Sequence, residues 1–422
     1  MHESSARPWY RKLHWQILLA MAIGLAVGGN SVTGPGAAAN LGWVGDLFVR
    51  LLRMVIVPLV LTSVISGVAS VGGGGSLGRL FGKTMGYYVL SSLLAILTGL
   101  LVVNLIRPGD GANLAKATAQ ALPELSTPSS PVDLLLGMVP TNVAAAAAQG
   151  DMLALILFSI LFGLAIVHLP EKPGQALLGF FDAAFQAMMQ ITSWVIRLAP
   201  IGVLGLMIRA ADRLDGSSIK ALALYMVTIA SALSIHLFVT LPLLLILLGR
   251  IKPSIHFKNM IEPLTMAFSS SSSAATLPVT MNAVEKRVGV SNKVSSFVLP
   301  MGATINMDGT ALYECAGVLF IAQAMGIHLS VLQQVTVVVT ALLASIGAAA
   351  VPSAGLVIIF LVLEAVDLRG PNVELIVGAM LGIDRPLDMF RTAVNVFSDS
   401  CGAAIIARSE GESAVDAEVA PL

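Results

Sequence analysis

The chain has 422 residues, of which 56% are hydrophobic and only 11% charged, and its 24 basic residues balance its 24 acidic ones. Its mean hydropathy is +0.87. Soluble domains carry about a quarter charged residues, so this composition excludes an ordinary soluble protein. Two cysteines, Cys315 and Cys401, are too few for a disulfide framework, and we expect both to be small buried side chains.

Apolar stretches long enough to cross a bilayer recur along the whole chain. About 20 apolar residues span the hydrocarbon core as a helix, whereas a transmembrane β-strand alternates apolar and polar residues over about ten. These stretches are continuously apolar, so the sequence predicts an all-α polytopic membrane protein in contact with membrane lipid and with no nucleic acid. Residues 1–12 show no clear signal-peptide cleavage site, so the first span is predicted to be retained. The eight predicted transmembrane helices are 13–30, 44–70, 77–107, 131–169, 174–211, 218–249, 292–324 and 371–408.

Two further segments, 253–287 and 330–367, are long enough to enter the membrane but are interrupted at their middles. The interruptions are the serine run Ser269–Ser273 and the stretch Ser345–Gly355, each of which contains or precedes a proline. Backbone freed inside a membrane must be buried in protein or face a polar cavity, so each segment is predicted to be a re-entrant helical hairpin. Each hairpin precedes a span, and this repeated order is typical of the inverted repeats of transporters.

Basic residues gather on one side of the predicted spans. Arg7, Arg11 and Lys12 precede the first span, and further Lys and Arg follow the second span, the sixth span and the first hairpin. Segment 28–46, between the first two spans, contains neither. Because cytoplasmic loops carry an excess of Lys and Arg, the sequence predicts a multi-pass inner-membrane protein with both termini in the cytoplasm, including the polar tail 409–422.

Charged residues within the predicted spans are concentrated in the last third of the chain, and such residues are costly in lipid unless they are paired or hydrated. Asp384, Asp388, Arg391, Asn395 and Asp399 follow one another at spacings of 4, 3, 4 and 4, which places them on one face of a helix. A structural ion-pair ladder would explain Asp388 with Arg391 but leaves Asp399 without a partner. Asp384 has only its neighbour Arg385, which is expected to point away from the stripe on a helix. The stripe therefore favours a transport site.

The span between the hairpins offers oxygen ligands that suit a hard cation. Its residues Asn306–Thr310 include Asp308, and Gly309 predicts local unwinding that exposes carbonyl oxygens. Sodium is expected to prefer carboxylate, amide and carbonyl oxygens, as other hard cations do. Asp308 with Asn395 and Asp399 therefore predicts a sodium site, and a buried aspartate bonded to Ser or Thr across helices is the alternative for Asp308.

Arg391 needs an anion, because a planar guanidinium binds carboxylate in a bidentate fork. We expect Arg391 to bind a side-chain carboxylate, Asp388 to bind an ammonium group, and Asn395 and Thr310 to bind an α-carboxylate together with backbone N–H groups. The hydroxyls of the serine run also need polar partners at membrane depth. This pattern predicts a sodium-coupled secondary transporter for aspartate or glutamate.

Glu314 lies six residues beyond Asp308 in the same span. Removal from water favours the protonated form of a carboxyl group, so Glu314 is a candidate proton carrier, with a structural hydrogen-bonding role as the alternative. The sequence contains no nucleotide-binding, nucleophile-elbow or metalloprotease motif, and an enzyme is not predicted. Four histidines show no metal-ligand spacing and are interpreted as loop or interfacial residues: His168, His236, His256 and His328.

Four stretches resemble motifs of the dicarboxylate/amino acid:cation symporter family, which includes the excitatory amino-acid transporters and the archaeal aspartate transporters. These stretches are the serine run with Ala275–Pro278, Gly302–Thr310, Ser345–Pro352 and Asp388–Asn395. The resemblance covers essentially the whole chain, 1–422, as one transmembrane unit. It implies a homotrimer that works as an elevator, with a static scaffold of 13–72 and 131–212 and a moving transport part of 77–107 and 218–408.

The resemblance also implies residues for three sodium ions and a substrate. The first sodium site is implied to comprise Gly302, Asn306, Asn395 and Asp399. A deeper site is implied to comprise Tyr88, Ser91, Ser92, Asn306 and Asp308. The third is implied to comprise Thr304, Met307, Ser345, Ile346 and Ala348, chiefly through backbone oxygens. The implied substrate contacts are Ser271, Ser273, Thr310, Val351, Gly355, Asp388, Arg391 and Asn395.

Two residues depart from the pattern of the family. Ala274 stands where relatives usually have a further serine, and Ala348 replaces a common threonine at the second hairpin tip. Glu314 resembles the animal transporters, in which this position is linked to proton movement. The alternative function is a proton-coupled symporter for C4-dicarboxylates with the same fold, although its substrate would give Asp388 no ammonium partner.

Overall fold

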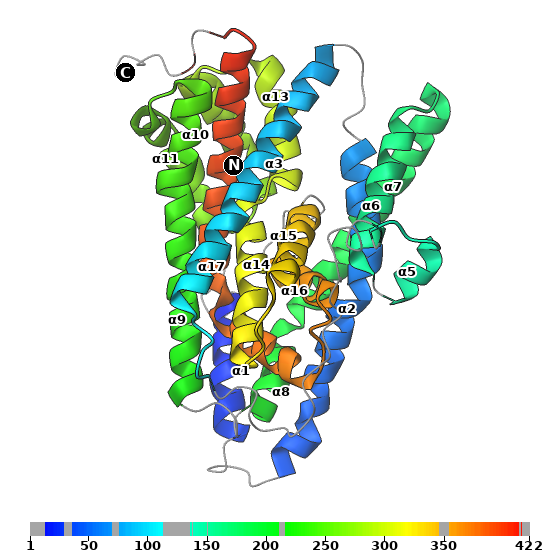
Figure 1. Cartoon of the computed structure of the whole chain (residues 1–422), viewed down its shortest axis with the longest axis vertical. Coiled ribbons are helices and arrows are strands. Elements are labelled where there is room, and N and C mark those ends of the chain that lie inside the picture. Colours follow the sequence, from blue (N-terminus) through cyan, green and yellow to red (C-terminus); the bar gives the residue numbers. More distant parts are fainter. Residues whose placement is uncertain are drawn as a thin grey trace, which may run out of the picture.

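A computed structural model describes residues 13–28, 36–69, 76–112, 136, 138–149, 151–210, 216–345, 354–412 and 415. All the regular elements in these ranges are helices, so the predicted all-α fold is confirmed (Figure 1). The first half contains α1 (Leu13–Gly28), α2 (Gly36–Ala69), α3 (Ser76–Ile106), α5 (Val143–Gln149), α6 (Met152–Val167), α7 (Glu171–Arg197), α8 (Ala199–Ala210), α9 (Gly216–Ile235), the π-helix η2 (His236–Thr240), α10 (Leu241–Leu244) and the π-helix η3 (Leu245–Gly249). The second half contains α11 (Pro253–Ser270), α12 (Ser273–Ala283), the π-helix η4 (Val284–Val288), α13 (Asn292–Ile305), α14 (Asp308–Ala324), α15 (Val331–Ser345), α16 (Ala354–Ala365) and α17 (Pro371–Ser409).

Three stretches of helix in the described ranges are long and apolar enough to cross a membrane: Leu41–Ala69, Arg79–Ile106 and Ser217–Gly249. A fourth candidate is the pair α7–α8, which is bent by 46° between Arg197 and Ala199. These criteria do not confirm the predicted number of eight spans, because several predicted spans consist of shorter helices separated by breaks. The helices nevertheless occupy the predicted stretches along the chain.

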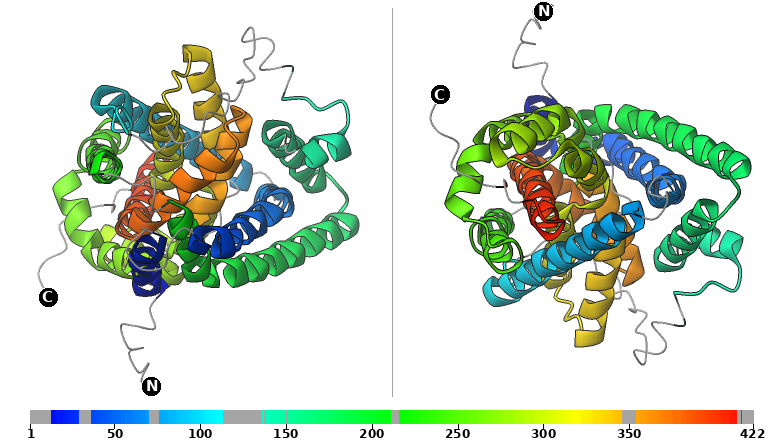
Figure 2. Two further views of the ribbon diagram at one scale, coloured as in Figure 1. Left: turned by 90° about the horizontal axis from the view of Figure 1, so that it is seen from below. Right: turned by 90° about the horizontal axis from the view of Figure 1, so that it is seen from above.

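Helices α14 and α17 form the centre of the molecule, with other helices around them (Figure 2). Each residue from Asp308 to Ala322 is buried, and so is each residue from Arg391 to Ala407. A helix that is buried all round has no polar outer face, and α14 accordingly packs against α3, α9, α15, α16 and α17. Polar side chains on these two helices must therefore find their partners inside the protein.

Helices α1, α2 and α8 pack against one another through glycines. A Cβ atom at Gly205 would lie 2.5 Å from the backbone nitrogen of Gly45, and one at Gly45 would lie 2.8 Å from the backbone nitrogen of Leu206. Small residues let helix backbones approach closely, which is how many membrane helices associate. The side chain of Leu206 also reaches α17, where a Cβ atom at Gly378 would lie 2.9 Å from its Cδ1. Helices α6 and α7 pack on α2 at one side of the molecule (Figure 1).

The two interrupted segments are pairs of packed helices. Helices α11 and α12 pack against each other and are separated by Ser271 and Ser272, which lie inside the serine run. Ser271 adopts a left-handed backbone with a φ of 52°, and the Oγ of Ser272 caps α12 by accepting a hydrogen bond from the backbone N–H of Ala275. Helices α15 and α16 likewise pack against each other, and the stretch between them, 346–353, lies outside the described residues.

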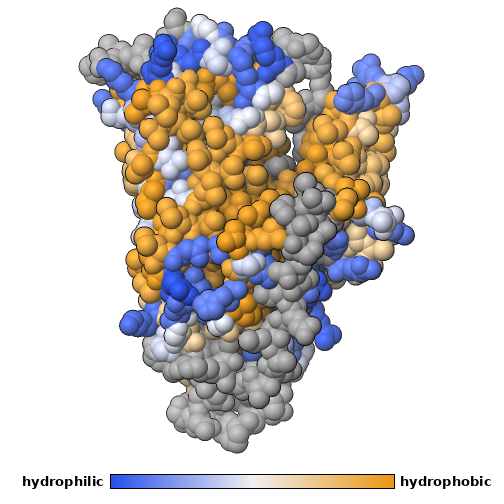
Figure 3. Space-filling model, viewed as in Figure 1, coloured by the Kyte–Doolittle hydropathy of each residue, from blue (hydrophilic) through white to orange (hydrophobic). Residues whose placement is uncertain are grey.

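The surface carries a wide apolar band, with hydrophilic residues above and below it on the face shown in Figure 3. On the continuous helix α9–η3 the exposed large apolar side chains are Ile219, Val227, Ile235, Phe238, Val239, Leu243, Ile246, Leu247 and Leu248. Exposed apolar area of this extent is unfavourable in water and is the normal surface of a protein in lipid.

Candidate functional site

The central polar site begins at a break between α13 and α14. Asn306 and Met307 leave the helical conformation, with φ/ψ angles of −97°/82° and −111°/62°. The sequence predicts unwinding here but attributes it to Gly309, and that attribution is wrong because Gly309 lies in the first turn of α14. Gly309 instead permits a close approach, since a Cβ atom there would lie 3.0 Å from the backbone oxygen of Arg391 on α17.

Asp308 lies at the start of α14, and its carboxylate accepts hydrogen bonds from three other helices. From α3, the Oγ of Ser92 is 2.6 Å from Oδ1 and the Oγ of Ser91 is 3.3 Å from it. From α17, the Oγ of Ser398 is 2.6 Å from Oδ2, and the Nε2 of His236 in η2 is 3.1 Å from the same oxygen. All of these side chains are buried.

Asp399 lies next to this group and is connected to it through Asn306. The Nδ2 of Asn306 donates to Oδ1 of Asp399 and to Oγ of Ser398, both at 3.0 Å. Gly302 leaves the necessary room, because a Cβ atom there would lie 2.5 Å from Oδ1 of Asp399 and 2.6 Å from the Oη of Tyr88. We call Ser91, Ser92, His236, Asn306, Asp308, Ser398 and Asp399 the Asp308 cluster.

The Asp308 cluster contains two buried carboxylates, and none of the salt bridges in the described part of the chain joins either of them to a Lys or Arg. Buried charges require a compensating partner. Within the same ranges no three His, Cys, Asp or Glu side chains come together as a metal-ligand group. The ligands on offer are hydroxyl, amide, carboxylate and backbone oxygens, which suit a hard monovalent cation better than a transition metal.

Arg391 lies on α17 about two turns before Asp399, and its guanidinium contacts two carboxylates and an aromatic ring. Its Nη2 is 2.9 Å from Oδ1 of Asp388, and its Nη1 is 3.1 Å from Oδ1 of Asp384. The guanidinium carbon lies 3.8 Å from the ring centroid of Tyr313 on α14. Arg385 binds the other oxygen of Asp388, with Nη1 3.1 Å from Oδ2. We call Tyr313, Asp384, Arg385, Asp388 and Arg391 the Arg391 cluster.

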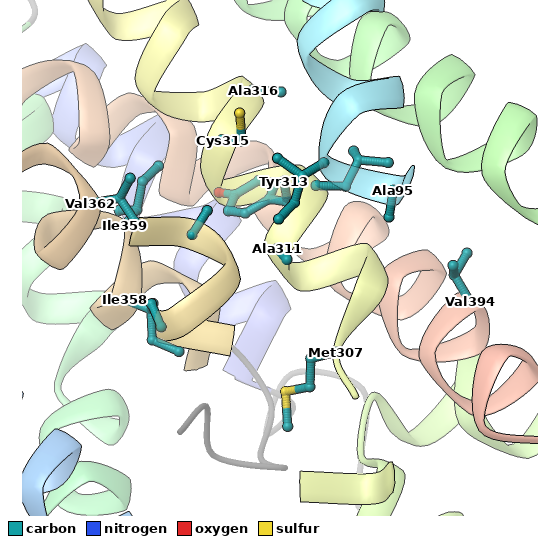
Figure 4. Close-up of a cluster of buried hydrophobic side chains, with 14 of the residues drawn as sticks. Ala95, Met307, Ala311, Tyr313, Cys315, Ala316, Ile358, Ile359, Val362 and Val394 are labelled. Atoms are coloured by element: carbon teal, nitrogen blue, oxygen red, sulfur yellow. The ribbon is translucent and has the colours of Figure 1, made fainter. Parts of the chain in front are cut away.

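Tyr313 anchors this cluster in an apolar environment. Figure 4 shows its ring in a group of buried side chains from α14 and α16, among them Ile358, Ile359 and Val362. The guanidinium of Arg391 is only 1% exposed. A cation over an aromatic face is stabilised by the ring quadrupole, and more strongly so away from water. The arrangement holds a permanent positive charge at a fixed place.

Asn395 connects the two clusters. Its Oδ1 accepts a hydrogen bond of 2.8 Å from the backbone N–H of Gly309, and its Nδ2 donates to Oγ1 of Thr310 at 3.3 Å. Asn395 and Thr310 are therefore together, as the sequence predicts for the substrate contacts, and they lie between the carboxylates of one cluster and the guanidinium of the other.

Three of the four residues that are predicted to contact substrate from the interrupted segments are buried, and one of these three faces Arg391 directly. A Cβ atom at Gly355 of α16 would lie 3.4 Å from Nη1 of Arg391, so the absence of a side chain leaves the guanidinium accessible from α16. Ser271 and Ser273 are 2% and 5% exposed, and within the described residues the Oγ of Ser271 has no hydrogen-bond partner. Val351 lies outside the described residues.

The third predicted sodium site is not brought together by the contacts of the described residues. Thr304 is exposed and its hydroxyl donates to the backbone oxygen of Met301 at 3.0 Å, while the hydroxyl of Ser345 donates to that of Leu342 at 2.8 Å. Met307 is buried. Ile346 and Ala348 lie outside the described residues.

Glu314 is fully buried on α14, one residue after Tyr313. Within the described ranges neither of its carboxyl oxygens has a hydrogen-bond partner. A buried carboxylate without a partner is very costly, so this environment favours the neutral, protonated form of the side chain. The structural hydrogen-bonding role considered for Glu314 has no support in these contacts.

The sequence patterns do not predict several residues that the structure places in or near the site. His236 and His256 are fully buried and contact Asp308 and Ser400, so their interpretation as loop or interfacial residues is wrong. A signal was present for His236, since it is an ionisable residue in the middle of an apolar span. Arg385 was expected to point away from the stripe, yet its side chain turns to Asp388. Ser398 could have been found because it neighbours Asp399 and lies three residues after Asn395.

An apolar outer band around buried carboxylates and a buried guanidinium is the arrangement expected of a multi-pass membrane transporter. The model of the sodium:dicarboxylate symporter family matches residues 13–409, and the chain belongs to this family. The family resemblance in the sequence is thereby confirmed, and its members are transporters rather than enzymes.

Relatives whose names state different substrates match nearly the whole chain. A proton/sodium-glutamate symport protein of Bacillus caldotenax is 35% identical over 406 residues, which cover 95% of each chain. Excitatory amino acid transporter 3 of Mus musculus is 36% identical over 463 residues, which cover 96% of this chain and 87% of the relative. C4-dicarboxylate transport protein 3 of Bradyrhizobium diazoefficiens is 34% identical over 418 residues, which cover 97% and 91%.

Proposed function

We propose that the chain is a secondary symporter that takes up aspartate or glutamate together with sodium. The observation that carries this proposal is the placement of two carboxylates, Asp308 and Asp399, close to one buried guanidinium, Arg391, since within the described residues neither carboxylate pairs with a Lys or Arg. The two carboxylates would bind a cation, and the guanidinium would bind a substrate carboxylate in exchange for one of its aspartate partners. The names of the glutamate-transporting relatives support the same conclusion.

Sodium would bind in the Asp308 cluster, at a deeper site that adds Tyr88 and at a site formed by Gly302, Asn306, Asn395 and Asp399. A third ion would bind at Thr304, Met307, Ser345, Ile346 and Ala348. Substrate would place its side-chain carboxylate on Arg391 and its ammonium group on Asp388. The tips at Ser271, Ser273, Val351 and Gly355 would close over it, while Thr310 and Asn395 hold the α-carboxylate.

The transport cycle would follow an elevator mechanism. Residues 13–72 and 131–212 would form a scaffold and the trimer contacts, and 77–107 with 218–408 would move across the membrane. The pairs α11–α12 and α15–α16 would be re-entrant hairpins in two inverted repeats, within a total of eight spans. We further propose an inner-membrane location with both termini in the cytoplasm, as the distribution of Lys and Arg indicates.

A proton would accompany the substrate on Glu314. The support is its complete burial and the lack of a hydrogen-bond partner for both oxygens within the described residues. A group in this position is more stable when neutral, and it would release its proton only when water or a cation reaches it.

A proton-coupled C4-dicarboxylate symporter is the second candidate, and one observation favours it. Asp388 binds guanidinium groups on both of its oxygens, so its charge is already balanced without a substrate ammonium group. The relative from Bradyrhizobium diazoefficiens carries a C4-dicarboxylate name.

Uptake into proteoliposomes separates the two candidates. Purified protein would be assayed with labelled L-aspartate, L-glutamate and succinate, with sodium and proton gradients imposed one at a time. We expect uptake of the amino acids to require sodium. Uptake of succinate alone, driven by a proton gradient and indifferent to sodium, would favour the second candidate.

A further inference from the structure

Asp388 stands between two arginines on the same helix. Arg391 binds its Oδ1 at 2.9 Å and Arg385 binds its Oδ2 at 3.1 Å. The two arginines differ in exposure, because the side chain of Arg391 is 1% exposed and that of Arg385 is 25% exposed. Arg391 is thus fixed in the protein interior, whereas Arg385 lies where part of its side chain meets the surroundings.

The second arginine changes what Asp388 can offer to a ligand. A carboxylate with one free oxygen attracts an ammonium group, but a carboxylate with a guanidinium on each oxygen has its charge balanced. The four ionised side chains Asp384, Arg385, Asp388 and Arg391 together carry no net charge. Loss of Arg385 would leave one negative charge more at this place, and it would remove the guanidinium from Oδ2 of Asp388.

We propose that Arg385 determines how strongly the site prefers dicarboxylates over acidic amino acids. An amino acid brings an ammonium group that competes with Arg385 for Asp388, whereas a dicarboxylate brings a second negative charge that benefits from Arg385. The inference rests on the proposed function, because it assumes that an acidic substrate binds at Arg391. It adds the residue that separates the two substrate classes.

The position of Arg385 suits this role better than a purely structural one. It precedes Asp388 by three residues, so both side chains lie on one face of α17. A partly exposed ion pair contributes little to folding, since solvent screens it. Its effect on a ligand bound at Arg391 would pass through Asp388, whose side chain is only 8% exposed and is therefore less screened by solvent.

The test compares two substrates in one preparation. Full-length wild type and Arg385→Met would be reconstituted in proteoliposomes, and KM would be measured for L-aspartate and for succinate. We expect the ratio of the succinate KM to the aspartate KM to rise about tenfold in the variant, because the removed charge acts on two carboxylates in one case and is offset by the ammonium group in the other. A ratio does not depend on the amount of folded protein.

Three variants control the result. Arg385→Gln removes the same charge with a polar side chain and should reproduce the change. Arg385→Lys keeps the charge and should hold the ratio within about threefold of wild type. Arg287→Met removes an exposed arginine that pairs with Glu262, and it should leave both KM values unchanged.

Two outcomes would overturn the inference. An equal change of both KM values, or no change, in Arg385→Met and Arg385→Gln would refute the role of Arg385 while wild-type uptake of aspartate upheld the proposed function. Absence of wild-type uptake of both substrates would refute the proposed function and the inference with it.

Discussion

The Asp308 cluster and the Arg391 cluster both include residues of α14 and α17, but they compensate their buried charges in opposite ways. Asp308 accepts hydrogen bonds from hydroxyl groups and an imidazole, and Asp399 from an amide. The Arg391 cluster balances its charges internally with two aspartates and two arginines. In the proposed function the first cluster would bind a cation, whereas the second would exchange one of its internal partners for a substrate group.

This difference suggests how ion and substrate depend on each other. Gly309 donates its backbone N–H to Asn395 and lies against the backbone of Arg391, so the break at Asn306–Met307 is fixed to both clusters. A cation that orders the break would also fix Asn395 and Thr310, which are proposed to hold the substrate. Each of the next four predictions perturbs one cluster and leaves the other intact, and the fifth concerns a site outside both.

The largest effect is expected for Arg391→Cys. The change removes the guanidinium and leaves Asp384 and Asp388 buried without it, which typically costs about 3–5 kcal/mol. We expect uptake of aspartate to fall by about 100-fold or more, and the site to accept a neutral amino acid instead. Uptake of labelled aspartate and serine into proteoliposomes measures both effects. Arg287→Cys, at an exposed ion pair, is the matched control, and retained aspartate uptake in Arg391→Cys would refute the assigned role.

Asp399→Asn should act on the ion rather than on the substrate. It removes one of the two charges of the Asp308 cluster, and we expect the sodium concentration for half-maximal uptake to rise by about 30-fold. Aspartate KM at saturating sodium should change much less. Asp182→Asn, on α7 beside Ser66 and Gln186, provides the control. An unchanged sodium requirement would count against Asp399 as a ligand.

Gly302→Ala tests the space beside Asp399. The added Cβ atom would lie within 2.6 Å of both Asp399 Oδ1 and Tyr88 Oη, so the side chains must shift, at a typical cost of about 1–3 kcal/mol. We expect the half-maximal sodium concentration to rise by about tenfold. Gly86→Ala on α3 has open space around its Cβ and should behave as wild type. If Gly302→Ala and Gly86→Ala have the same half-maximal sodium concentration, the space beside Asp399 does not affect sodium binding.

His236 offers a comparison between two amides. Its Nε2 reaches Asp308, and the amide nitrogen of glutamine can occupy nearly the same place, whereas that of asparagine lies nearer the Nδ1 position. We expect His236→Gln to stay within about twofold of wild type in sodium dependence and His236→Asn to weaken it about fivefold, the value of one hydrogen bond. If the glutamine variant is the weaker one, the contact to Asp308 does not orient the carboxylate.

The smallest effect is expected outside both clusters, at Glu410. Arg79 and Lys83 at the start of α3 hold the pKa of Glu410 at about 2. Because this pKa lies below the value of an unfolded glutamate, the pair contributes stability at neutral pH and loses it as the pH falls from about 4 towards 2. Glu410→Gln should lower the Tm by about 1 °C at pH 7, and the difference from wild type should shrink below about pH 4 and disappear only below about pH 2. A difference that grows on acidification would contradict this.

Local sequence patterns predict the helices and the first interruption well, because both depend on local chemistry. Continuous apolar length gives the helices, and Ser271–Ser272 separates α11 from α12 inside the predicted serine run. The spacing of the stripe places Asp388 and Arg391 on one face of α17, where they form an ion pair. Asn395 lies on the same face and contacts Thr310 of α14. The number of spans could not be verified, because helix breaks divide the apolar segments.

Hydrophobic and polar patterns in the sequence do not predict contacts between helices that are distant along the chain. His236 meets Asp308 across 72 residues, and it does so from a π-helical turn that shifts the register of side chains away from the 3.6-residue period. Arg385 was misjudged for the opposite reason, since its long side chain reaches back to the stripe although its Cα lies beside it. Flexible side chains and irregular turns are where helical periodicity loses its predictive value.

The glycine contacts of Leu206 have a mechanical consequence. Its backbone lies against Gly45 of α2 and its side chain against Gly378 of α17, so one leucine touches both the proposed scaffold and the proposed moving part. Van der Waals contacts alone link the Leu206 side chain to Gly378, so this contact would slide without breaking a hydrogen bond in the proposed elevator motion. The ion pair between Arg53 of α2 and Glu374 of α17, at 3.2 Å, would instead have to break, so it would stabilise the resting position of α17 against the scaffold.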